Sequence, residues 1–314
     1  SLVLALVMIG MTAVPASAKE ACQPIWQLPA SVSDYDVTED EVRSFEEEYE
    51  RQLRGDSISL FSVEGDLEEA AKEESIEEFA EKKALVLTAL YGLTSVQYAL
   101  IEDGEITVTG TSGYTDKDTK KEADGSTMYG IGSVSKMFTT IAVLQLVEEG
   151  KIDLDKPVVS YIPEFKMADE RYKDITVRML LNHSSGILGS SFENAILFND
   201  NDTINHDTFL EMLATQRLKA NPGDFSVYCN DGFTLAEILV ERVSGQSFSA
   251  YIEENIRVPL NMWGTKTPQD KFKKKKLAGI YSGKLKLPAE NLNQIGAGGI
   301  YSTAENLCYL AEVF

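Results

Sequence analysis

The chain has 314 residues, 43% of them hydrophobic, and a formal net charge of -21. This length and composition are typical of a globular protein with one large domain or two small ones. So acidic a surface repels phosphate backbones, which argues against nucleic-acid binding. The three cysteines and two histidines form neither a disulfide framework nor a zinc-ligand pattern, so we expect no metal and no other cofactor.

Residues 1–18 resemble the end of a secretory signal peptide. An apolar run ends in Ala16-Ser17-Ala18, which has the A-x-A form of a cleavage site. The run is too short to be a good membrane span. We therefore expect a secreted mature chain that begins at Lys19 and has no membrane span; a buried N-terminal helix is the alternative.

Residues 19–74 form an acidic N-terminal extension. A capping box at Thr38 and Glu41, followed by apolar residues at helical spacing, predicts a helix that ends at Gly55. Between Asp34 and Lys82 there are nineteen acidic and five basic residues. A solvated face or a tether is the usual meaning of such a run, and binding of cations or of a basic partner is the alternative.

A folded domain is predicted from residue 75 to residue 314. It opens with a helical stripe over 76–92 and a β-hairpin over 95–109 that turns at Asp103-Gly104. Five helices are then predicted, followed by a last one that ends at Phe314; the five cover residues 133–149, 176–182, 207–216, 234–244 and 247–256. This order predicts an α+β fold in which a mainly helical subdomain is inserted into an antiparallel sheet layer.

The stretch "YGIGSVSKMFTT" at 129–140 holds the strongest candidate for chemistry. If a helix begins at Ser133, Lys136 lies one turn further on the same side and can take the proton of the serine hydroxyl. A helix N-terminus also favours the oxyanion that such a nucleophile creates. Lys136 must then be neutral part of the time, which requires burial or a second cation. Ser135 points away and is the weaker candidate.

A second group lies in "NPGDFSVYCNDGF" at 221–233, in a loop predicted to precede a helix near Thr234. Tyr228 offers a phenol that could exchange protons with Lys136. Asn230 offers an amide that can both donate to and accept from a peptide-like substrate. Taken alone, this short match would more often be a surface loop with a packed tyrosine.

Together these motifs resemble the penicillin-binding, class C β-lactamase-like serine hydrolases. The matches occur in the family's order, and they are "GSVSK", "LVEEGKIDLDKPVVSYIPEF", "ITVRMLLNHSSGI", "NPGDFSVYCNDGF", "RVPLNMWGT" and "GAGGIYST". The resemblance implies a β-lactamase/transpeptidase-like fold and a place in the bacterial cell envelope. A third family motif, Lys-Thr-Gly or His-x-Gly, is not in the chain, so we expect it beyond Phe314 and expect the sheet to be incomplete.

The resemblance also implies residue roles. Ser133 is the nucleophile that forms an acyl-enzyme, Lys136 its proton acceptor or electrostatic partner, and Tyr228 the group that activates the deacylating water. Asn230 positions the substrate amide, and the backbone N–H of Ser133 forms half of the oxyanion hole. His183 matches a loop with a structural role, and Cys229 stands where serine is more usual, as a thiol open to oxidation or alkylation.

Two functions follow from these implications. The leading prediction is a secreted serine hydrolase that acts on a β-lactam, a D-Ala-D-Ala peptide or a carboxylic ester, three substrate classes that one fold can host. The alternative is a non-catalytic cell-wall binder or penicillin sensor of the same fold. A structural or interaction protein led by the acidic extension has no motif in its support. The sequence does not predict an oligomeric state.

Overall fold

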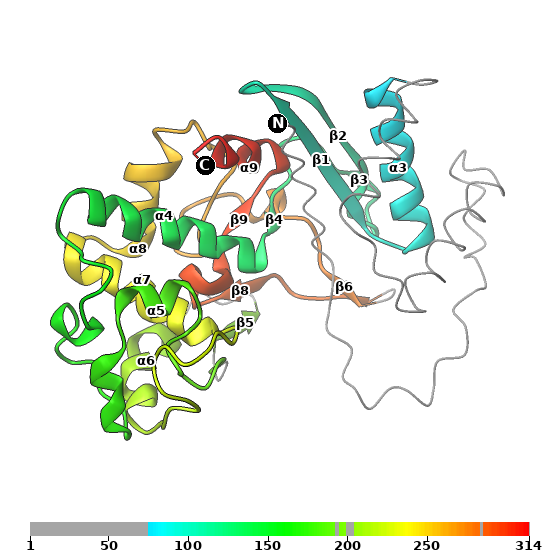
Figure 1. The fold of residues 1–314 in the computed structure, drawn as a ribbon. Helices are drawn as coiled ribbons and strands as arrows, with labels where there is room; N and C mark the ends of the chain where they lie inside the picture. The colour runs from blue at the N-terminus through cyan, green and yellow to red at the C-terminus, as the bar shows by residue number, and fades with distance from the viewer. Residues whose placement is uncertain (1–74, 192–194, 199–203, 283–284, 314) are drawn as a thin grey trace. The chain divides into compact units, whose positions relative to one another are not determined.

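The computed structural model describes residues 75–191, 195–198, 204–282 and 285–313 (Figure 1). The predicted signal segment, the acidic extension and the helix over 38–55 lie outside these residues. The chain forms two compact units. The described part of the first unit comprises residues 75–127, 275–286 and 303–313, and the second unit comprises 128–274 and 287–302. The second unit is therefore inserted into the first along the chain.

The first unit is a helix-covered β-hairpin. Ser75 caps the first helix in a capping box with Glu78, and Thr88 Oγ1 on this helix lies 3.0 Å from Ser112 Oγ on the hairpin. The predicted turn is confirmed, since Asp103 and Gly104 both have positive φ. The elements of the first unit are α3 (Ile76–Leu90), β1 (Ser95–Glu102), β2 (Glu105–Asp116), β3 (Lys121–Glu122), β6 (Tyr281–Ser282), β7 (Leu285–Lys286) and α9 (Ala304–Ala311).

Small apolar side chains let α9 pack closely on β1. Ala99 and Ile101 on the strand meet Ala304 and Cys308 on the helix in one buried cluster. The side-chain amide of Gln97 joins three segments, because its Oε1 accepts from Ala304 N and its Nε2 donates to Asp124 O. The last helix ends at Ala311, so the prediction that it runs to Phe314 is wrong.

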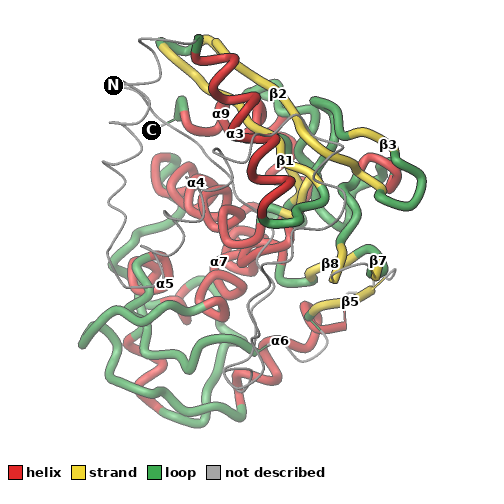
Figure 2. Tube along the Cα trace, turned by 90° about the vertical axis from the view of Figure 1, so that its right-hand side faces the viewer, coloured by secondary structure: helices red, strands yellow, loops and turns green. Residues whose placement is uncertain are grey.

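The second unit is mainly helical, as predicted for the inserted subdomain. Figure 2 shows α4 and α7 side by side at its centre, and both contact the segment η8. Its helices are η3 (Gly132–Val134), α4 (Ser135–Glu148), η4 (Val158–Ser160), η5 (Glu170–Asp174), α5 (Val177–Leu181), α6 (Ile204–Ala214), α7 (Asn230–Ser244), α8 (Phe248–Ile252), η6 (Glu253–Arg257) and η8 (Ile295–Gly299). A further turn, η7 (Lys274–Lys276), lies where the chain passes from this unit to the first.

Two short antiparallel ribbons complete the second unit. In one, β4 (Tyr129–Gly130) pairs with β9 (Tyr301–Ser302), and in the other β5 (Ile196–Phe198) pairs with β8 (Glu290–Leu292). Sequence periodicity did not predict β5 and β8, because strands of three residues are too short to show an alternation. Buried apolar side chains from α4 and α7 form the core beneath them, among them Phe138, Leu146, Leu235 and Leu239.

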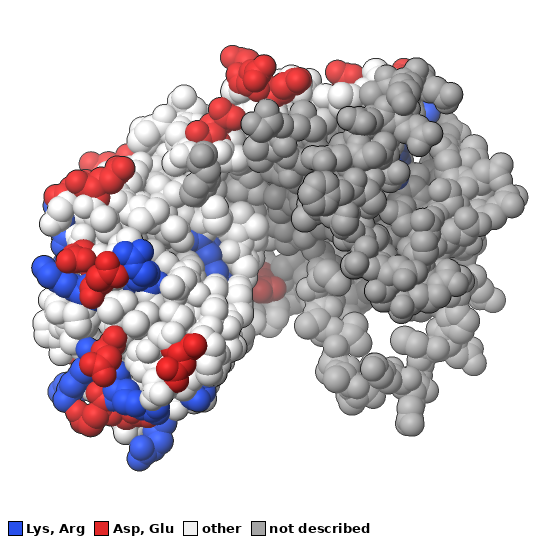
Figure 3. Space-filling model, in the orientation of Figure 1, with Lys and Arg blue, Asp and Glu red and all other residues white. Residues whose placement is uncertain are grey.

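On the face shown in Figure 3, basic and acidic side chains of the second unit lie beside one another. Exposed ion pairs of the second unit include Arg178 with Asp155 and Arg242 with Glu164. Such pairs contribute little to stability. Among the described residues, no helix is both long enough and apolar enough to cross a bilayer.

Candidate active site

The turn that presents Ser133 is fixed by its neighbours on both sides. Strand β4 ends at Gly130, and the next residue, Ile131, donates its N–H to Ile300 O at 2.9 Å. Gly132 then adopts a φ of +50°, a left-handed conformation that glycine takes at little cost. The prediction that an α-helix begins at Ser133 is wrong: residues 132–134 form a 3₁₀ turn, and α4 begins at Ser135.

The 3₁₀ turn still brings the predicted pair together. The turn continues into α4, residues three apart on such a helical surface are neighbours, and Lys136 Nζ lies 3.3 Å from Ser133 Oγ. Ser133 is exposed, whereas Ser135 is fully buried. The Ser135 hydroxyl accepts from Ile300 N at 3.1 Å, so Ser135 joins two segments of the framework while Ser133 faces solvent.

Lys136 is a buried amine held by acceptors on three sides. Besides Ser133, its Nζ donates to Asn230 Oδ1 at 2.7 Å and to the backbone oxygen of Ala297 at 2.6 Å. It lies 4.8 Å from the centre of the Tyr228 ring, and only 6% of the residue is exposed. Burial lowers the pKa of Lys136, and interaction with Tyr228 opposes this in part.

Tyr228 reaches the nucleophile from a distant loop. Its hydroxyl is in short hydrogen-bond contact with Ser133 Oγ, and half of the residue is exposed. The ring packs on His183 with 4.7 Å between centroids. His183 has a φ of +63°, and its Nδ1 accepts from Cys229 N at 3.1 Å. His183 therefore holds Tyr228 through its ring and the loop of Tyr228 through the Cys229 N–H, which agrees with the structural role expected of it.

Asn230 is the first residue of α7, so the prediction that this helix begins near Thr234 is wrong. Cys229 is the N-cap, and its sulfur accepts from Gly232 N at 3.3 Å. Because Asn230 stands on the helix, its amide is fixed in direction. Its Oδ1 accepts from Lys136, and its Nδ2 donates to Ser190 Oγ at 2.8 Å.

The expectation that the Cys229 thiol is open to reagents does not agree with its surroundings. The residue is 1% exposed. Burial also raises its pKa, which leaves less of the reactive thiolate at neutral pH. Cys229 is thus a packing and capping residue beside the site.

Two contributors to the site were not predicted from the sequence. One is the exposed hydroxyl of Ser190, and the other is the backbone oxygen of Ala297. The segment around Ala297 is held by α4 and α7. Thr139 Oγ1 of α4 donates to Gly296 O at 2.8 Å, and Gly296 N donates to Glu237 Oε2 of α7 at 2.7 Å. The glycine-rich "GAGG" stretch is the signal that could have marked this backbone for close approach to another segment.

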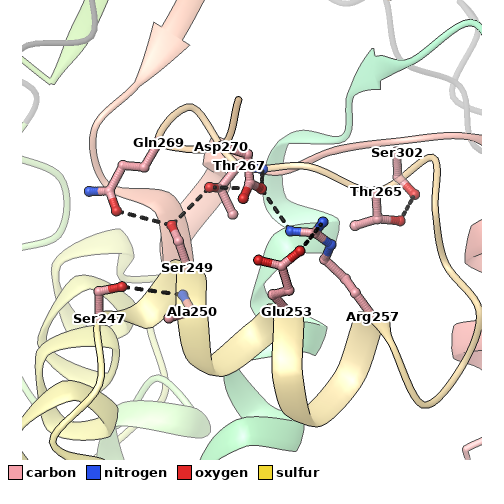
Figure 4. A network of polar contacts seen from close by, with 10 residues as sticks. All are labelled: Ser247, Ser249, Ala250, Glu253, Arg257, Thr265, Thr267, Gln269, Asp270 and Ser302. Carbon is pink, nitrogen blue, oxygen red and sulfur yellow. Dashed lines mark hydrogen bonds and ion pairs between the residues drawn. The ribbon is translucent and has the colours of Figure 1, made fainter. Parts of the chain in front are cut away.

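Two groups of polar contacts, one around Arg257 and one between Thr265 and Ser302, lie close to each other in the second unit (Figure 4). Arg257, 3% exposed, donates to Asp270 at 2.7 Å and to Glu253 at 3.3 Å. Thr265, in the same loop as Asp270, hydrogen-bonds Ser302 of β9 through its hydroxyl at 2.8 Å. Since β9 pairs with β4, which leads into Ser133, the Thr265–Ser302 hydrogen bond supports the strand from which the nucleophile turn starts.

The structure thus brings the four predicted residues, Ser133, Lys136, Tyr228 and Asn230, into one connected group within the second unit. The side chains of Ser133, Lys136 and Tyr228 can move a proton among themselves, and the amide of Asn230 orients the lysine. Over the described part of the chain, no group of three or more His, Cys, Asp or Glu side chains is arranged to hold a metal ion.

The protein has the β-lactamase/transpeptidase fold, in which helices are mixed with small antiparallel sheets. The chain belongs to the Beta-lactamase family, whose model matches residues 76–312. It is similar to Protein flp of Staphylococcus aureus, with 30% identity over 177 residues that cover 56% of this chain and 35% of the relative. Putative penicillin-binding protein PbpX of Bacillus subtilis is 29% identical over 163 residues, which cover 52% of this chain and 39% of PbpX.

Solved structures share the fold. FmtA from Staphylococcus aureus superposes with a TM-score of 0.61 at 22% identity, over 76% of this chain and 64% of FmtA. The octameric penicillin-binding protein homologue from Pyrococcus abyssi also gives 0.61, at 26% identity, over 76% of this chain and 56% of the homologue. The chain spans just over a third of the length of the two curated relatives.

Proposed function

We propose that the protein is a serine hydrolase that works through an acyl-enzyme on Ser133. The convergence of the Ser133 hydroxyl, the buried Lys136 amine and the Tyr228 phenol carries this proposal. A serine is a weak nucleophile until a neighbouring base accepts its proton. Burial that lowers the pKa of Lys136 enlarges the neutral fraction that can serve as this base.

In the proposed reaction, Ser133 Oγ attacks the carbonyl carbon of the substrate while its proton passes to Lys136 or Tyr228. The tetrahedral oxyanion is stabilised by the backbone N–H of Ser133 and by the positive end of the helix that follows. The leaving group takes the proton as its bond to the carbonyl carbon breaks; it departs from a peptide or an ester and stays tethered through the opened ring of a β-lactam. Water then attacks the acyl-enzyme, with Tyr228 as its base, and releases the acid and free Ser133.

We propose that the substrate is a compound that can acylate Ser133: a β-lactam, a D-Ala-D-Ala peptide or a carboxylic ester. The likeness to PbpX, named a putative penicillin-binding protein, and to the penicillin-binding protein homologue of Pyrococcus abyssi favours this range. We further propose that the protein acts outside the cytoplasm in the cell envelope, after cleavage behind Ala18. N-terminal sequencing of the secreted form should then begin at Lys19.

The test compares the wild-type protein with Ser133→Ala. Hydrolysis of a chromogenic ester, hydrolysis of a chromogenic cephalosporin and release of D-alanine from a D-Ala-D-Ala peptide are measured, together with labelling by a fluorescent penicillin. We expect turnover of at least one substrate and its loss in the variant. Equal rates in both proteins would refute the role of Ser133. One equivalent of label without turnover would favour the alternative of a penicillin sensor.

A further inference from the structure

Three consecutive residues of the loop that carries Tyr228 contact His183. The backbone N–H groups of Val227 and Cys229, which flank Tyr228, donate to the His183 carbonyl oxygen at 2.9 Å and to its ring Nδ1 at 3.1 Å. The Tyr228 ring packs on the His183 ring with 4.7 Å between centroids. His183 thus holds both the side chain of Tyr228 and the backbone on either side of it. The contact of the Tyr228 hydroxyl with Ser133 therefore depends on His183.

The hydrogen bond from Cys229 defines the protonation state of the imidazole. Because Nδ1 accepts an N–H, it carries no proton, and the neutral ring has its hydrogen on Nε2. An imidazolium has an N–H on both nitrogens and accepts nothing. The Cys229 N–H would then lose its acceptor in a residue that is 1% exposed, and a buried donor without a partner is costly. Protonation of His183 therefore breaks the bond that holds the backbone between Tyr228 and Asn230.

The direction of the imidazole is fixed by packing. Besides Tyr228, Phe233 of α7 lies against it, with 5.1 Å between ring centroids. The backbone of His183 has a φ of +63°, a left-handed conformation in which histidine, asparagine and aspartate are enriched among the residues other than glycine. A ring held in this way keeps Nδ1 directed at Cys229, so a proton added to Nδ1 displaces the loop.

The surroundings of the ring disfavour its cation. His183 is half-buried and takes part in no ion pair with any described residue. Burial lowers the pKa of His183, and the positive charges of Lys136 and Lys219 lower it further. The titratable groups that the packed elements place around the ring are Lys136 on α4, Lys219, Tyr228 and Cys229 in the segment 219–229, and Asp231 on α7, whose carboxyl accepts from Ser191.

We infer that His183 is a positioning residue that acts through Tyr228: its neutral form, protonated on Nε2, holds the phenol beside Ser133, and a proton from solvent on Nδ1 releases the loop and slows the reaction. The inference rests on the proposed function. The site then needs two groups in their neutral form, His183 to hold the phenol and Lys136 to accept the proton of the nucleophile. Activity therefore falls more steeply at acid pH than loss of the lysine base alone would make it fall.

Nuclear magnetic resonance tests the inference without turnover. The chain has two histidines, so long-range 1H–15N spectra of the labelled protein contain two imidazoles, and either His183→Asn or His206→Asn assigns them. We expect the Nε2–H tautomer for His183 at neutral pH and a titration midpoint below 6.5, its ordinary pKa. The amide proton of Cys229 should move upfield with the same midpoint, because its hydrogen bond is lost. A proton on Nδ1 at neutral pH, or a Cys229 signal that does not follow His183, would overturn the inference.

The pH profile of acylation is the second test, measured from about pH 4 to 8 by fluorescent penicillin or ester hydrolysis. Below the His183 midpoint, the slope of the logarithm of the wild-type rate against pH should steepen from one toward two. His183→Asn keeps an oxygen that can accept from Cys229 and tolerates the positive φ, but it does not titrate, so its slope should stay at one. One pH unit below that midpoint, the wild-type protein should have lost about tenfold more activity than the variant.

His206→Asn, the same change at the other histidine, is the matched control and should retain the steepening. A wild-type slope that never exceeds one, or a steepening that His183→Asn retains, would overturn the inference and leave the proposed function to the Ser133→Ala test. If no substrate is turned over and no label is bound, the proposed function fails. The titrations of His183 and of the Cys229 amide then still decide whether only the neutral ring holds the loop.

Discussion

Lys136 has two tasks that conflict. Its charged form is stabilised, because the oxygens of Asn230 and Ala297 accept hydrogen bonds from the ammonium and two aromatic rings lie near it. As the proposed base it must lose its proton. Burial works against the charged form and lowers the pKa of Lys136, so a larger fraction of the amine is neutral than in an exposed lysine.

Lys136→Arg is therefore the most informative single change. Arginine keeps the charge and the hydrogen-bond donors but cannot serve as a base in a protein. We expect the rate of acylation to fall by about a hundredfold or more, with only a small change in thermal stability. Labelling by fluorescent penicillin or ester turnover measures the rate, and a thermal melt provides the control. A variant with near-native rate would exclude Lys136 as the base.

The same reasoning gives a pH dependence. A base must be deprotonated, so the acylation rate should rise with pH and level off above the pKa of Lys136 in the free enzyme. Because burial lowers this pKa, the midpoint should lie below 10.5, the ordinary value for a lysine. Rates that fall with rising pH over this range would contradict the assignment.

Two loops that are distant in sequence form one element around the site. Residues 183–190 and 219–229 run beside each other, joined by hydrogen bonds such as Val227 N to His183 O and Lys219 N to Gly186 O. The first loop carries His183 and Ser190, and the second carries Tyr228. Gly186 is a point of close approach, because a Cβ atom there would lie 2.5 Å from Ala220 O.

Gly186→Ala should therefore separate the two loops. Its φ of +77° strains any L-residue, and the clash with a backbone oxygen adds to that strain. We expect a loss of stability of about 3 kcal/mol and a fall in acylation. Gly150→Ala is the matched control, since Gly150 has a φ of +70° and open space around it, and should cost only about 1 kcal/mol. Urea denaturation measures both, and equal losses would show that the close approach is unimportant.

The buried charge of Arg257 allows a prediction about stability. Asp270→Asn would leave the buried guanidinium of Arg257 with only the more exposed Glu253 as an anionic partner. We expect a loss of about 2 kcal/mol. Glu164→Gln breaks the exposed pair with Arg242 and should cost under about 1 kcal/mol. If denaturant titrations give equal losses, the contacts of Arg257 do not stabilise the fold in the way described.

At the scale of the whole molecule, the features that could be predicted from the sequence are those that short stretches of residues determine. Asp103-Gly104 indicated the hairpin, and alternating and helical periodicities indicated the sheet layer with its helical insertion. The start of α7 was missed because cysteine is an unusual N-cap, so the polar Asn230 and the later Thr234 suggested a longer loop. The structure corrects this by placing Asn230 on the helix.

The rest of the site depends on long-range packing. Ser190 meets Asn230 from a position 40 residues earlier, and Ala297 reaches Lys136 from 161 residues later. The contribution of Ala297 is a backbone oxygen, which any residue provides, and Ser190 belongs to no spacing pattern with its partner. The packing of α4, α7 and η8 brings Ala297 to Lys136, and the hydrogen bond from Asp231 N to Gly189 O holds the loop of Ser190 against the start of α7.

Net charge allows a last prediction at this scale. With a formal charge of -21, mutual repulsion of carboxylates disfavours the compact state, whereas the exposed ion pairs contribute little each. Screening should therefore stabilise the protein as NaCl rises from about 0.02 M to 0.3 M, by roughly 1 kcal/mol or 2–4 °C in Tm. The rise should level off once the Debye length falls to a few ångströms. A melting temperature that falls over this range would mean that the ion pairs outweigh the repulsion. A rise that continues unchanged to molar salt would report solvent exclusion instead.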